Sequence, residues 1–97
     1  MLNVKGIEGN YMEYKGKPLV RYENEFYYGD MRDKYILFLM VMTKKKAQGS
    51  DMEVPDNVMV QIIPSDGSVE VKKQGMAKGL YAALDLGTAW LERENRS

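Results

Sequence analysis

The sequence YILFLMVM at residues 35–42 decides the fold, because all eight of its side chains are apolar. A β-strand points alternate side chains to opposite faces of its sheet, so an unbroken apolar run indicates a strand that is covered on both faces. A buried helix of the same length is the alternative interpretation. The Tyr, Ile, Phe and Val content and the turn residues on both flanks favour a strand. We therefore predict a central strand here.

Shorter runs of aromatic and β-branched residues flank this strand and are separated by turn residues. Such runs are typical of strands joined by tight turns, which form an antiparallel meander. After the central strand, Asp66-Gly67 is a strong hairpin signal between two further strands. The sequence predicts a sheet of about five or six strands. The predicted strands flanking the central one are Tyr11–Tyr14, Leu19–Tyr22, Phe26–Tyr28, Val58–Ile63 and Val69–Lys72.

One amphipathic helix is predicted over residues 75–94. At about 100° per residue, its apolar side chains gather on one side, as expected for a helix that packs across a sheet. Small residues at Gly79, Ala83 and Gly87 would let the helix approach closely. The predicted class is therefore α+β, with residues 1–97 as a single domain. The predicted buried side of the helix comprises Met76, Leu80, Ala83, Leu84, Gly87 and Leu91.

Two segments carry weaker patterns. Residues 1–10 contain Gly6 and Gly9 and are predicted to be a short strand or an extended arm. Residues 44–57 form the longest polar stretch, and we expect a mobile loop there. The first ten residues lack the uninterrupted apolar stretch of a secretory signal, so we expect a cytoplasmic protein without a membrane span.

Composition excludes several kinds of chemistry. The chain has no Cys and no His, which removes thiolate nucleophiles, disulfides and the commonest zinc ligands and general bases. Fourteen basic and fourteen acidic residues give a net charge of zero, which argues against nucleic acid as a partner. We predict no catalytic residue, cofactor or metal site.

Two polar clusters nevertheless allow functional interpretations. Asp30 and Asp33 flank a turn near Tyr28 and could form the carboxylate and tyrosine site of a small enzyme or ligand-binding domain, although turn acids are usually solvated. A second group of basic residues could contact an anion or nucleic acid, although exposed lysines also prevent edge-to-edge pairing of sheets. This basic group comprises Arg32, Lys44, Lys45, Lys46, Lys72 and Lys73.

The strongest functional indication is that the predicted helix cannot cover both apolar faces of the predicted sheet. One helix can shield only one face, yet both faces of residues 35–42 are apolar, so something else must cover the second face. The N-terminal arm or a curled sheet could do so within one chain, and a second copy of the chain could do so as a two-fold dimer. We therefore expect a non-enzymatic binding or scaffold protein that acts as a homodimer, with the nucleic-acid accessory protein as the alternative. The predicted interface residues are Tyr35, Leu37, Leu39, Val41 and Met59.

Overall fold

The computed structural model describes residues 11–68 and 70–96. They form a six-stranded antiparallel sheet, a separate two-stranded ribbon and one C-terminal helix. The predicted arm at residues 1–10 lies outside the described residues. The strands are β1 Tyr11–Tyr14, β2 Lys17–Tyr22, β3 Glu25–Tyr28, β4 Tyr35–Val41, β5 Lys44–Lys46, β6 Glu53–Pro55, β7 Asn57–Pro64 and β8 Lys73–Lys78, and the helix is α1 Leu80–Arg96.

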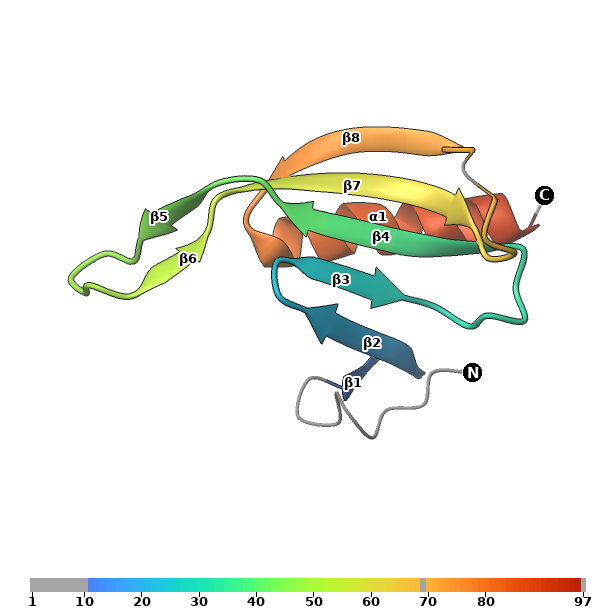
Figure 1. The fold of residues 1–97 in the computed structure, drawn as a ribbon, viewed down its shortest axis with the longest axis horizontal. Helices are drawn as coiled ribbons and strands as arrows, with labels where there is room; N and C mark the ends of the chain where they lie inside the picture. Colours follow the sequence, from blue (N-terminus) through green and yellow to red (C-terminus); the bar gives the residue numbers. More distant parts are fainter. Residues whose placement is uncertain (1–10, 69, 97) are drawn as a thin grey trace.

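The strands of the large sheet follow the order β1-β2-β3-β4-β7-β8, and every neighbouring pair is antiparallel. The apolar run at residues 35–42 supplies β4, which lies between β3 and β7. Figure 1 shows the sheet as one layer with α1 lying behind it as the second layer. The predicted α+β meander with one helix on one face is confirmed.

The core lies between α1 and the strands β4 and β7. Leu37, Leu39, Val60 and Ile62 are completely buried there. Gly87 brings the helix close to the sheet, because a Cβ at this position would lie 2.5 Å from Cδ1 of Leu37. Of the predicted buried side of the helix, Ala83, Leu84, Gly87 and Leu91 are buried and Leu80 is partly buried. The prediction was wrong for Met76, which lies in β8 and is 54% exposed.

The predicted start of the helix, at residue 75, is wrong. Residues Lys73–Lys78 form β8, and α1 begins at Leu80. The return strand predicted at Val69–Lys72 is also misplaced, because residues 70–72 are not in a strand and the strand that pairs with β7 begins at Lys73; Val69 lies outside the described residues. Pairing with β7 outweighs the helical periodicity of this segment. Gly75 suits the strand because a Cβ added at this position would lie only 2.7 Å from the ring of Trp90. Gly79, with φ of 85°, then turns the chain into the helix.

The loop predicted at residues 44–57 is also structured. β5 and β6 pair antiparallel, with Lys44 opposite Pro55 and Lys46 opposite Glu53. The amide of Ala47 donates to the carbonyl of Met52 and closes the tip. We call this hairpin the ribbon, and Figure 1 shows it extending beyond the end of the large sheet. The sequence of these residues shows no apolar alternation, so the two strands of the ribbon are recognised only from their backbone pairing.

Candidate interaction surface

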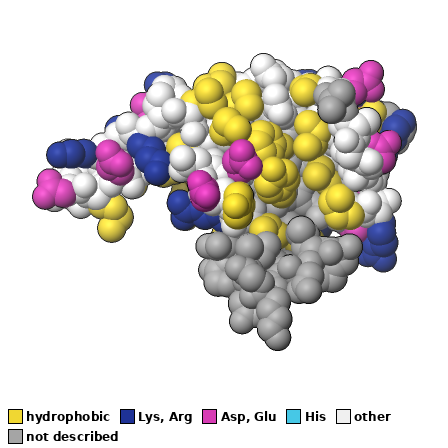
Figure 2. All heavy atoms as spheres, in the orientation of Figure 1, with side chains coloured by type: hydrophobic (Ala, Val, Ile, Leu, Met, Phe, Trp, Pro, Cys, Tyr) yellow, Lys and Arg dark blue, Asp and Glu magenta, His cyan; other side chains and the backbone are white. Residues whose placement is uncertain are grey.

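The candidate site is the side of the large sheet that faces away from α1, which we call the open face. Figure 2 shows a broad band of hydrophobic side chains across the middle of this face. Val58, Val60 and Ile62 of β7 point toward the core, so the alternate residues of β7 lie on the open face. The register of strand pairing then identifies the residues of the neighbouring strands that lie on the same face. The apolar residues of the open face are Val20, Tyr22, Tyr27, Ile36, Phe38, Met40, Met59, Ile63 and Met76, of which Val20 and Ile36 are buried.

Three methionines form a row across the centre of the open face. Met40 of β4 pairs with Met59 of β7, and Met59 pairs in turn with Met76 of β8. Met40 and Met59 are partly exposed, and Met76 is 54% exposed. We call these three residues the methionine row. Unbranched thioether side chains adapt to irregular partners, which suits them to a contact surface.

A second row runs beside the first and is aromatic at one end and polar at the other. The rings of Tyr27 and Phe38 lie 5.1 Å apart between centroids. Next to them, the side-chain amide of Gln61 donates to the Oε1 atom of Gln74 at 2.6 Å. This hydrogen bond pairs one N–H of Gln61 with the carbonyl oxygen of Gln74, so these two groups remain paired when the row is covered.

Charged side chains of opposite sign lie at opposite sides of the open face. Glu13 of β1 and Glu25 of β3 lie on one side, and Lys78 of β8 lies on the other. The hydroxyl of Tyr27 donates to Glu25 at 3.1 Å, and its partial burial and this carboxylate raise the pKa of Tyr27. Lys78 approaches Asp56 at 3.8 Å. The face therefore has an acidic side and a basic side around an apolar centre.

A concave region of about 240 Å³ lies at the acidic side, next to the turn between β2 and β3. We call this region the hollow. Its walls combine carboxylates with apolar side chains, so it suits a long side chain with an apolar stem and a cationic or thioether end. The hollow is lined by Tyr22, Glu23, Asn24, Glu25, Met40 and Val41.

The predicted interface residues divide between the two faces. Leu37 and Leu39 are fully buried beneath α1 and Val41 is 8% exposed, so these side chains are not available to a partner in this structure. Tyr35 is partly buried and packs against the same core. Met59 lies on the open face. The partly exposed side chains of β4 on the open face are instead Phe38 and Met40.

The sequence of β7 indicates which side chains lie on the open face. Val58, Val60 and Ile62 alternate with Met59 and Gln61, which marks the first set as the buried side. Phe38 pairs with Gln61 and Met40 pairs with Met59, so Phe38 and Met40 lie on the open face as well. The uniform apolar character of β4 alone could not distinguish the two faces.

The basic residues are not brought together. Lys44, Lys45 and Lys46 lie on the ribbon, whereas Lys73 pairs with Ile62 near the other end of β7. Lys45 and Lys46 each lie 4.0 Å from a carboxylate, and Lys72 lies 3.9 Å from Glu94. Lys73 lies over the ring of Trp90. These residues therefore form no common phosphate-binding surface.

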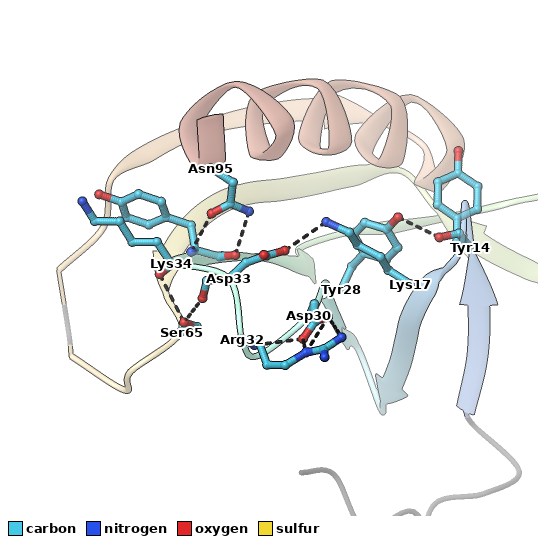
Figure 3. Close-up of polar contacts among 10 residues, drawn as sticks. Tyr14, Lys17, Tyr28, Asp30, Arg32, Asp33, Lys34, Ser65 and Asn95 are labelled. Atoms are coloured by element: carbon cyan, nitrogen blue, oxygen red, sulfur yellow. Dashed lines mark hydrogen bonds and ion pairs between the residues drawn. The ribbon is translucent and has the colours of Figure 1, made fainter. Parts of the chain in front are cut away.

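The polar groups near the turn between β3 and β4 each have a partner in the chain (Figure 3). Asp30 accepts from Arg32 at 2.7 Å, and these hydrogen bonds lower the pKa of Asp30 to about 2. Asp33 pairs instead with Lys17 at 3.1 Å. The hydroxyl of Tyr28 donates to the carbonyl of Tyr14 at 2.7 Å, and burial raises the pKa of Tyr28. The arrangement stabilises the turn and does not pair the two carboxylates.

Comparison of this chain with protein-family models, with curated protein sequences and with solved structures found no match. Within residues 11–68 and 70–96, no group of three or more acidic side chains is placed to hold a metal ion. In the same described part of the chain, no helix has the length and apolar character needed to cross a membrane.

Proposed function

We propose that this chain is a non-enzymatic binding protein that acts through protein contact and forms a homodimer. The observation that carries the proposal is the open face, where partly exposed apolar side chains extend over β3, β4, β7 and β8. Among the described residues, α1 packs on the opposite side of the sheet. Contiguous exposed apolar surface of this kind marks protein contact sites.

A second copy is the partner that the composition of the open face favours. Its apolar centre lacks ionised side chains, while Glu25 and Lys78 lie at its margins. An apolar centre with a polar rim is the usual anatomy of a protein interface. A face that carries both signs of charge can complement itself, which a symmetric dimer requires.

The size of the face is also adequate. With strands about 4.8 Å apart and about 3.3 Å per residue, the part from β2 to β8 covers a flat area of about 500 Å². Side chains that interdigitate bury more than the flat area. Stable interfaces bury roughly 800 Å² of accessible surface per partner, which is of the same order as this face.

The test places a charge at the centre of the open face. Phe38→Glu should leave the circular dichroism spectrum unchanged and convert the dimer to monomer, because an unpaired carboxylate in a dry interface is strongly unfavourable. Tyr81→Glu is the matched control, since Tyr81 is 82% exposed on the outer side of α1. Light scattering after size exclusion gives the mass. A wild-type monomer at millimolar concentration would refute the proposal.

A further inference from the structure

We infer that the two copies pack open face to open face about a two-fold axis parallel to the strands, so that Met76 and Lys78 of each copy enter the hollow of the other. This inference rests on the proposed homodimer and specifies its geometry. Its basis is the correspondence between one exposed pair of side chains on β8 and one concave region beside β3.

The direction of the axis follows from the strand order. A two-fold axis that runs along the strands between β4 and β7 exchanges the two sides of the sheet, which places β3 of one copy over β8 of the other. Positions along the strands are preserved by this rotation. The methionine row of one copy therefore lies over the methionine row of its partner, with Met40 facing Met59. Aligned sheets of this kind keep their strand directions within about 30° of each other and lie about 10 Å apart.

The same rotation brings opposite charges together. Glu25 lies in the same row as Met76, and Lys78 lies two residues farther, at the end of the sheet where Glu23 and Asn24 form the β2–β3 turn. After rotation, Lys78 of one copy lies beside Glu23 and Glu25 of the other. An axis perpendicular to the strands would instead place β8 over β8, so that Lys78 would not lie over Glu23 or Glu25 of the other copy.

The shapes correspond as well as the charges. Met76 is 54% exposed and projects from β8, whereas the hollow provides about 240 Å³ beside β3. The apolar walls of the hollow suit the thioether of Met76, and its carboxylates suit the ammonium group of Lys78. Two such contacts form in each dimer because the axis repeats every contact.

A charge-reversal pair tests the geometry. Glu25→Lys and Lys78→Glu should each weaken the dimer at least fivefold, because each places like charges together at both contacts, and the double variant should recover most of the lost affinity. Glu92→Lys, which makes the same charge change on the exposed side of α1, should have little effect. Sedimentation equilibrium gives the dissociation constants. Failure of the double variant to recover would overturn this geometry.

A cross-linking experiment provides an independent readout, since the chain has no native Cys. Equal amounts of the Asn24→Cys and Lys78→Cys variants are mixed and treated with a short bismaleimide, which should join them into a covalent heterodimer. The mixture of Asn24→Cys with Tyr81→Cys is the control and should remain unlinked. A stable dimer in which only the control pair becomes linked would refute the geometry and leave the proposed function standing. A wild-type monomer would refute both.

Discussion

The side-chain amide of Asn95 makes two hydrogen bonds to the backbone of Tyr35. The amide of Tyr35 donates to Oδ1 of Asn95 at 2.9 Å, and Nδ2 of Asn95 donates to the carbonyl of Tyr35 at 3.2 Å. Figure 3 shows Asn95 reaching from the end of α1 to the start of β4. These residues are 60 positions apart in the sequence, so the contact fastens the last turn of the helix to the central strand. The contact thereby holds the C-terminal end of the helix against the side of the sheet opposite the open face.

Asn95→Ala should destabilise the fold by about 1–3 kcal/mol, because it leaves two partly buried backbone groups of Tyr35 without their partner. Denaturant unfolding of monomeric Phe38→Glu protein measures this change without a contribution from dimerisation. Glu92→Ala, an exposed position nearby on α1, should change stability by less than about 0.5 kcal/mol. Equal effects of the two substitutions would contradict the role of Asn95.

Gly87→Ala should also destabilise the fold, by about 1–3 kcal/mol, although Ala is the better helix former by about 1 kcal/mol. The added methyl group would meet Cδ1 and Cδ2 of Leu37 at 2.5 and 2.7 Å, and Leu37 is fully buried. The helix must then move away from the sheet. Denaturant unfolding checks the prediction, and a stabilised Gly87→Ala variant would contradict the close approach.

The carboxyl group of Asp30 should titrate with a midpoint of about 2, below its usual 3.8, because Arg32 donates to it. Since the pKa is lower in the folded state, this group stabilises the fold above pH 3.8, and that contribution disappears as the pH falls through 2. Carboxyl ¹³C shifts measured by NMR give the midpoint. The Arg32→Ala variant should return it toward 3.8, and an unchanged midpoint would show that Arg32 is not the cause.

Hydrogen peroxide should dissociate the proposed dimer of the wild-type chain, because oxidation converts the thioethers of the methionine row into polar sulfoxides. A variant with Met40→Leu, Met59→Leu and Met76→Leu should remain dimeric under the same treatment. Other exposed methionines, such as Met31 and Met52, remain in this variant and serve as the internal control. Mass spectrometry counts the sulfoxides, and light scattering gives the mass. Equal dissociation of both proteins would exclude the methionine row as the cause.

The sequence predicted the class of fold because the apolar run of β4 and the Asp66-Gly67 turn are strong local signals. It misplaced the start of α1 because Lys73–Lys78 fits a helical period, whereas pairing with β7 makes it a strand. The ribbon carries no apolar pattern, so no local signal revealed it. The sequence predicted a second apolar face, but it could not identify the residues on that face, because they are determined by which side of β4 the helix covers. Contacts such as that of Gly87 with Leu37 determine the side, and they are formed only in the tertiary structure.

Sedimentation equilibrium of the wild-type chain at neutral pH, from micromolar to millimolar concentration, tests the central claim most directly. Burial of two open faces predicts a mass that rises with concentration from that of the 11.1 kDa chain to twice that value and no further, since a two-fold contact closes on itself. A mass that stays at 11.1 kDa throughout, or one that grows beyond two copies, would contradict the account.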